Sequence, residues 1–97
     1  MKAQRIFYDK AVLPDGSILE MTIWQVPRTS TERPHGLKYS LFYGHNGVRL
    51  VGYDNESGKG DHKHIGDTQT RYKFVNIEKM VADFMADVEE ARGEHDD

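Results

Sequence analysis

The chain has 97 residues, the size of one small domain with a single modest hydrophobic core. It contains no cysteine, which excludes disulfides, thiolate metal sites and thiol nucleophiles and is compatible with a reducing cytosol. The N-terminus leads into no apolar secretory segment, and no apolar run approaches the roughly 20 residues that span a bilayer. We therefore expect a single domain over residues 1–97, located in the cytoplasm and without a membrane partner.

The net charge of −3 is unevenly distributed along the chain. Residues 78–97 contain eight acidic and two basic side chains, a local charge of −6, whereas residues 1–77 carry +3. A mildly basic body can bind an anion, and the acidic segment either binds a basic partner or is simply a solvated helix surface. We expect the solvated surface, ending in an acidic frayed tail from about residue 93 to residue 97.

The first third of the chain predicts two strands and a loop. Residues 4–13 alternate roughly in polarity and predict one strand, residues 18–26 predict a second, and Pro14 and Gly16 favour a turn between them. Residues 18–26 carry apolar side chains on both faces, as in a strand that is covered on both sides. Residues 27–36 predict a loop with three basic side chains, which we expect to be solvated: Arg28, Arg33 and His35.

The middle of the chain predicts a hairpin. Residues 37–43 alternate as a third strand, and Asn46-Gly47 is a strong signal for a two-residue turn. Residues 48–53 are then expected to pair back as a fourth strand. We expect a loop over residues 54–67 and a fifth strand over residues 68–75.

One helix is expected at the end of the chain. Asn76 is a suitable N-cap and Gly93 a suitable stop. The residues between them form one apolar stripe at helical spacing: Ile77, Met80, Val81, Phe84, Met85, Val88 and Ala91. The expected fold is α+β, an antiparallel meander of four or five strands with the C-terminal helix packed on one face. The other face is solvated, curled into a half-barrel, or buried in an oligomer such as a homodimer.

The segment His62-Lys63-His64 points most directly at chemistry. In an extended chain both imidazoles lie on one side and Lys63 on the other. Two imidazoles can act as an acid/base pair near neutral pH or can supply two ligands of a transition metal. The sequence shows no evident third ligand, so we expect no metal and no cofactor.

Cations surround these histidines. Lys59, Lys63 and Arg71 are suited to hold a phosphate. Metal-independent RNA cleavage needs a base for the 2′-hydroxyl, an acid for the leaving oxygen and cations for the developing charge. Trp24 and the tyrosines could stack bases, although such residues in a small β domain usually form core or cross-strand pairs, which is what we expect.

Several motifs together resemble the TumE-like family of small prokaryotic toxins from type II toxin–antitoxin pairs. They lie within roughly residues 37–90 and occur in this order: Tyr39-Ser40-Leu41, Gly52-Tyr53-Asp54-Asn55, Gly58-Lys59-Gly60-Asp61-His62-Lys63-His64, Tyr72-Lys73-Phe74, and Asp83-Phe84 with Asp87-Val88. The resemblance implies a cytoplasmic protein with a helix-turn-helix antitoxin as partner. It also implies that the matching positions are site residues: Tyr53, Asp54, Asn55, His62 and His64.

We therefore expect a toxin that acts as a metal-independent ribonuclease. His62 and His64 would be the acid/base pair, and Asp54 or Asn55 would orient an imidazole. Two alternatives stay open at this point. One is a non-catalytic module that binds a partner protein or nucleic acid, and the other is a metal-binding hydrolase that uses His62 and His64.

Overall fold

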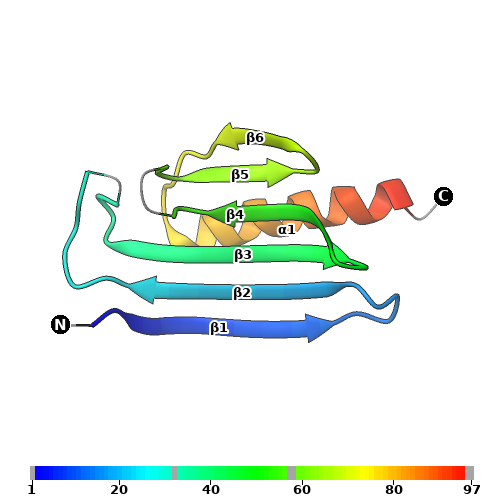
Figure 1. Cartoon of the computed structure of the whole chain (residues 1–97), viewed down its shortest axis with the longest axis horizontal. Helices are drawn as coiled ribbons and strands as arrows, with labels where there is room; N and C mark the ends of the chain where they lie inside the picture. The colour runs from blue at the N-terminus through cyan, green and yellow to red at the C-terminus, as the bar shows by residue number, and fades with distance from the viewer. Residues whose placement is uncertain (1, 32, 57–58, 96–97) are drawn as a thin grey trace.

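The computed structural model describes residues 2–31, 33–56 and 59–95. Six strands form one antiparallel sheet in chain order, followed by one helix (Figure 1). The elements are β1 (Gln4–Val12), β2 (Ile18–Gln25), β3 (Leu37–His45), β4 (Val48–Asp54), β5 (His62–Ile65), β6 (Thr68–Arg71) and α1 (Ile77–His95). The α+β class and the meander are confirmed, with more strands than expected.

The additional strand lies where a loop was expected. Residues 62–65 pair with β4 and then, through a two-residue turn at Gly66-Asp67, with β6. Gly66 has a φ of 57°, which glycine adopts without steric cost and which suits the first position of a tight hairpin turn. The expected fifth strand is correspondingly short, because it ends at Arg71 and does not reach Val75.

The predicted hairpin between β3 and β4 is confirmed. Asn46 and Gly47 have φ values of 52° and 77°, the left-handed conformation that this turn requires at both positions. Beyond the turn, a bulge shifts the register so that Gly44 lies opposite Arg49 and Tyr43 opposite Val51. Arg49 is thereby brought onto the same face as Gly52.

The helix begins where the sequence indicates but ends later. The Asn76 side chain accepts a hydrogen bond from the Lys79 N–H at 2.8 Å, as an N-cap does. The helix continues through Gly93 to His95, so the predicted stop at Gly93 is wrong. Glycine inside a helix costs about 1 kcal/mol but does not by itself end one. Of the predicted acidic tail, Asp96 and Asp97 lie outside the described residues, as does Gly58 of the histidine motif.

The hydrophobic core lies between the helix and one face of the sheet. Met80, Phe84 and Val88 of α1 are fully buried, together with side chains from three strands: Leu19, Met21 and Ile23 of β2, Tyr39, Leu41 and Tyr43 of β3, and Val51 and Tyr53 of β4. Figure 1 shows α1 behind the sheet at the level of β4 and its neighbours, with β1 at the far edge.

The face opposite the helix, here called the open face, has no second layer among the described residues. The covering expected on both sides of β2 is therefore found on one side only. Leu19, Met21 and Ile23 are buried, whereas Ile18 is 37% exposed and Trp24 is partly exposed on the open face. The functional side chains described below lie on this open face.

Candidate functional site

Strand β5 separates its polar side chains between the two faces of the sheet. His62 and His64 lie side by side on the open face, with ring centroids 5.0 Å apart. Lys63 points to the helix side, where its ammonium group lies 3.3 Å from Asp87 and 5.7 Å from the centre of the Tyr53 ring. The shared face of the two imidazoles follows from the strand geometry.

His62 is buried and held at both ring nitrogens. Nδ1 lies 3.0 Å from the carbonyl oxygen of Gly60, and because a carbonyl only accepts, Nδ1 carries the proton. Nε2 faces Asp54 Oδ1 at 2.5 Å across the β4–β5 ladder. Two lone pairs at this distance repel each other, so a shared proton or a metal ion must lie between the two atoms.

Asp54, His62 and His64 form a compact cluster. Their ligand atoms all lie within 4.8 Å of one another. His62 is only 3% exposed, whereas Asp54 and His64 are partly exposed. His64 is therefore the imidazole that a substrate on the open face can reach, while His62 is buried beside it.

The pKa of His64 is lowered from 6.5. Burial is the main cause and the nearby Arg49 guanidinium is the second, while Asp54 opposes them by raising the pKa. A lowered pKa keeps the imidazole neutral at physiological pH, and a neutral imidazole can accept a proton.

Arg49 reaches this position because Gly52 has no side chain. A Cβ at Gly52 would lie 2.7 Å from the Cδ of Arg49, closer than such atoms approach in proteins. Arg49 was not expected from the sequence to be a functional residue. Its signal was Gly52 inside the same strand, since a strand glycine often marks a close approach.

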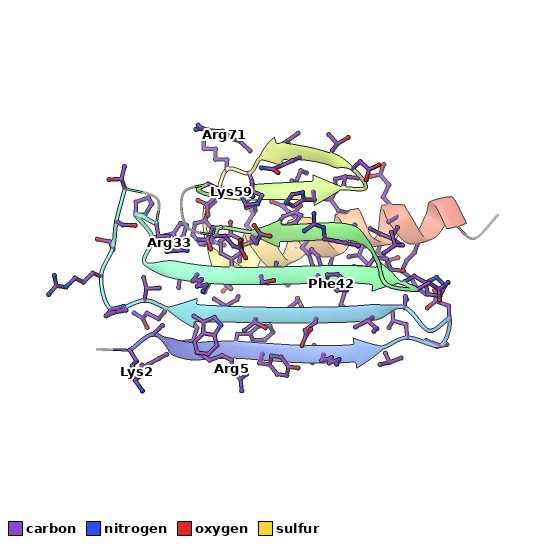
Figure 2. The ribbon with its side chains drawn as sticks, viewed as in Figure 1. Lys2, Arg5, Arg33, Phe42, Lys59 and Arg71 are labelled. Atoms are coloured by element: carbon purple, nitrogen blue, oxygen red, sulfur yellow. The ribbon has the colours of Figure 1, made fainter. Side chains whose placement is uncertain are left out.

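The predicted phosphate-binding cations divide into two groups. Lys59 and Arg71 line one cavity of about 400 Å³, together with Thr31, Pro34, Gly60, Asp61 and Tyr72. Arg71 lies opposite His62 in the sheet register. Figure 2, in which the open face is toward the reader, shows Lys59 and Arg71 at the β5–β6 end of the molecule. Lys63 is on the other face and does not join them.

Tyr53 and Asn55 lie away from the histidines. Tyr53 is buried on the helix side, and its hydroxyl donates to Asp87 at 2.5 Å. Burial and this hydrogen bond raise the pKa of Tyr53 far above its usual value. Asn55 is fully buried, accepting from the Tyr39 N–H at 3.0 Å and donating to the Leu37 carbonyl at 2.7 Å. These hydrogen bonds of Tyr53 and Asn55 stabilise the fold and leave neither side chain facing the histidines.

In the basic loop before β3, Arg28 is exposed as expected, whereas Arg33 and His35 are tied to the sheet. The Arg33 guanidinium donates to the carbonyl of Asn55 at 2.9 Å. His35 donates through Nε2 to Asp61 at 3.0 Å, while its Nδ1 accepts the Leu37 N–H at 3.1 Å. These contacts close the loop over the end of the sheet and shape the cavity at Lys59 and Arg71.

The fold and the site define a small α+β protein with a histidine–carboxylate cluster on the open face of an antiparallel sheet. The family described as toxin TumE matches residues 2–92, and the chain belongs to this family. No curated protein and no solved structure matches the chain significantly.

The family match supports a toxin role, and a toxin of a toxin–antitoxin pair has an antitoxin as its partner. The match also extends over β1 and β2, which the motif resemblance did not cover. Among the described residues, no helix is both long and apolar enough to cross a membrane.

Proposed function

We propose that the protein is a toxin that cleaves RNA at the cluster of Asp54, His62 and His64. One observation supports this most strongly. A reachable imidazole lies beside the His62–Asp54 pair, and burial and the Arg49 guanidinium lower its pKa. This combination supplies a base, a cation for a phosphorane and a group that stabilises the charged imidazole.

In the proposed reaction His64 accepts the proton of the ribose 2′-hydroxyl as that oxygen attacks phosphorus. The bond from phosphorus to the 5′-oxygen breaks, and the imidazolium returns the proton to this leaving oxygen. The products are a 2′,3′-cyclic phosphate and a 5′-hydroxyl. The buried position of His62 favours a supporting role, in which His62 holds Asp54 in place and the Asp54 carboxylate stabilises the imidazolium of His64.

Phosphate binding is proposed for Arg49, Lys59 and Arg71. Arg49 acts on the pKa of His64 more strongly than Lys59 does, and it is suited to the charge that develops on the scissile phosphate. Lys59 and Arg71 line the adjacent cavity, where a neighbouring phosphate would fit. Tyr53, Asn55 and Lys63 have no place in this arrangement, because their polar groups bind elsewhere in the fold.

The test uses His64→Ala and His45→Ala as a matched pair. His45 lies at the end of β3, where its Nε2 is 2.9 Å from the Asp15 carbonyl. With a labelled RNA in the presence of EDTA, we expect His64→Ala to slow cleavage by about 100-fold or more and His45→Ala to have no effect. Full growth inhibition by the His64→Ala variant would overturn the proposal and favour the non-catalytic alternative, a toxin that acts by binding.

A second candidate, a metal-dependent hydrolase, is favoured by the same cluster. Two imidazoles and one carboxylate are a common ligand set for transition metals, and Asp54 would be the third ligand, whose position relative to the histidines the sequence alone did not give. Asp54 Oδ1 is buried without a hydrogen bond of normal geometry to any described residue. The Gly60 carbonyl fixes His62 as metal-ligating histidines are usually fixed.

Elemental analysis separates the two candidates. A first-row metal bound at one equivalent, retained on dialysis and lost in Asp54→Ala, would establish the metal-dependent reaction. Cleavage that persists in EDTA would establish the metal-independent one.

We also propose that the partner is a helix-turn-helix antitoxin. The support is the family match together with the resemblance of the sequence motifs. Co-expression with the neighbouring gene product should give a stable complex and restore growth. A toxin that is neutralised without such a complex would contradict this proposal.

A further inference from the structure

The open face carries one continuous polar row across all six strands. The sheet register places Tyr8 opposite Thr22, Thr22 opposite Ser40, Ser40 opposite Asp54, Asp54 opposite His62, and His62 opposite Arg71. With strands about 4.8 Å apart, roughly 14 Å separate β2 from β5 on this face. The row therefore leads from the β1 edge directly to the histidine cluster.

Aromatic side chains lie along this row on three strands. Tyr8 is 45% exposed on β1, and Trp24 and Phe42 are partly exposed on β2 and β3. The Arg5 guanidinium lies 4.7 Å from the centre of the Tyr8 ring and 5.9 Å from that of Trp24. Figure 2 shows Arg5 at the β1 edge and Phe42 in the middle of the face. These rings form a set of flat apolar surfaces next to cations.

The charge of the molecule divides between its two sides. The strands place five basic side chains on the open face and two acidic ones, Glu20 and Asp54. The basic residues are Arg5, Lys10, Lys38, Arg49 and Arg71. Both acidic groups are engaged, Glu20 by the Tyr8 hydroxyl at 2.9 Å and Asp54 by His62. The excess of acidic residues lies on α1, behind the sheet.

We propose that the open face binds single-stranded RNA across the strands, from Arg5, Tyr8 and Trp24 to His64. Bases stack on exposed aromatic rings and phosphates pair with basic side chains, the two features that this face combines. In a duplex the faces of the bases are covered by neighbouring base pairs, so they cannot stack on these aromatic rings. The inference rests on the proposed function, because it gives the substrate class for the same site.

The single tryptophan of the chain provides the probe. We expect its fluorescence to be quenched saturably by an oligouridylate, less by a duplex of equal length, and less again as salt rises. With a fluorescein-labelled oligouridylate, Tyr8→Ala and Trp24→Ala should each weaken binding by about fivefold or more. Phe7→Ala is the matched control, since Phe7 is 40% exposed on the same strand but points to the other face.

All titrations are made in the His64→Ala background, so that binding and cleavage are measured separately. Equal affinity for duplex and single strand, or unchanged affinity in Tyr8→Ala and Trp24→Ala, would overturn the inference while leaving cleavage at His64 open. Binding as expected without any cleavage by the wild type would instead overturn the proposed function. A Trp24 signal that follows protein concentration and not RNA would overturn the inference and assign the face to a second copy of the chain.

Discussion

His62 Nε2 and Asp54 Oδ1 lie 2.5 Å apart on the open face, where the His62 side chain is almost fully buried and the Asp54 side chain is partly exposed. Their strands, β4 and β5, are neighbours, and the two residues are directly opposite in the register. The pair is thus built into the sheet itself, and it holds the group next to His64 in a fixed position.

Asp54→Asn should remove the charge that faces His62 while keeping the shape of the side chain. We expect the free energy of unfolding to fall by about 1–3 kcal/mol, because His62 loses a charged partner in a buried place. Cleavage should fall about tenfold or more, since the imidazolium of His64 is less stabilised. Urea unfolding and RNA cleavage measure the two effects. Asp67→Asn, in the β5–β6 turn, should change neither, and an equal loss in that control would show that the effect is not specific to Asp54.

The pKa of His64 offers a test that needs no substrate. Because burial and Arg49 lower it from 6.5, an NMR titration should give a midpoint below 6.5. Arg49→Ala should raise that midpoint, and Arg5→Ala, a distant arginine on the same face, should not. The unfolded chain binds this proton more readily than the folded one. The contribution of His64 to stability is therefore fully present above pH 6.5 and is lost as the pH falls through the folded pKa. A midpoint above 6.5 in the wild type would contradict the assignment.

Two glycines of the sheet should respond differently to alanine. At Gly52 the added methyl group meets the flexible side chain of Arg49, which can move away. We expect a stability loss of less than about 1.5 kcal/mol and a raised pKa of His64. At Gly44 the methyl group meets the Val48 carbonyl oxygen at 2.6 Å, and backbone cannot yield as a side chain does.

Gly44→Ala is therefore expected to cost about 1–3 kcal/mol, which is roughly 4–8 °C in Tm for each kcal/mol. Thermal unfolding measures the stability loss of both variants, and an NMR titration of Gly52→Ala measures the pKa of His64. If Gly44→Ala were the milder change, the close approaches described for the two strands would be incorrect.

Asn55 is expected to behave as a structural residue. Asn55→Ala leaves the Tyr39 N–H and the Leu37 carbonyl without their partner in a buried region. The free energy of unfolding should fall by at least about 2 kcal/mol. Loss of the Asn76 cap in Asn76→Ala should cost about 1 kcal/mol and serves as the reference. RNA cleavage per folded molecule should stay the same in Asn55→Ala. A loss of cleavage per folded molecule would show that Asn55 belongs to the functional site.

Tyr53→Phe separates the two faces of the sheet. Only the hydrogen bond to Asp87 is lost, so the cost should be about 1 kcal/mol with cleavage unchanged. Tyr72→Phe is the matched control, because its hydroxyl donates to Asp83 at 2.7 Å in the same way. Chemical unfolding and cleavage assays on both variants test this. Cleavage that falls in Tyr53→Phe but not in Tyr72→Phe would place Tyr53 in the catalytic machinery.

Local signals in the sequence were sufficient for most of the fold. The period-two pattern of residues 37–43, the turn at Asn46-Gly47, the cap at Asn76 and the helical stripe from Ile77 each depend on neighbours along the chain. The same holds for the shared face of His62 and His64, which follows from strand alternation. Local signals failed at the Gly66-Asp67 turn, whose flanking strands are too short and polar to be recognised, and at Gly93, where the helix continues to His95.

The composition of the site was decided by pairing between strands. Asp54 reaches His62 because β4 and β5 are in one particular register, and a register cannot be read from either strand alone. For the same reason the three neighbours in the motif Tyr53-Asp54-Asn55 have different surroundings. Tyr53 lies on the helix side, Asp54 on the open face, and Asn55 is hydrogen-bonded to the backbone of β3. Arg49 enters the site through a bulge and a glycine three residues away. The sequence by itself determined which residues carry the chemistry of the histidine segment, and the tertiary structure decided which side chains face it.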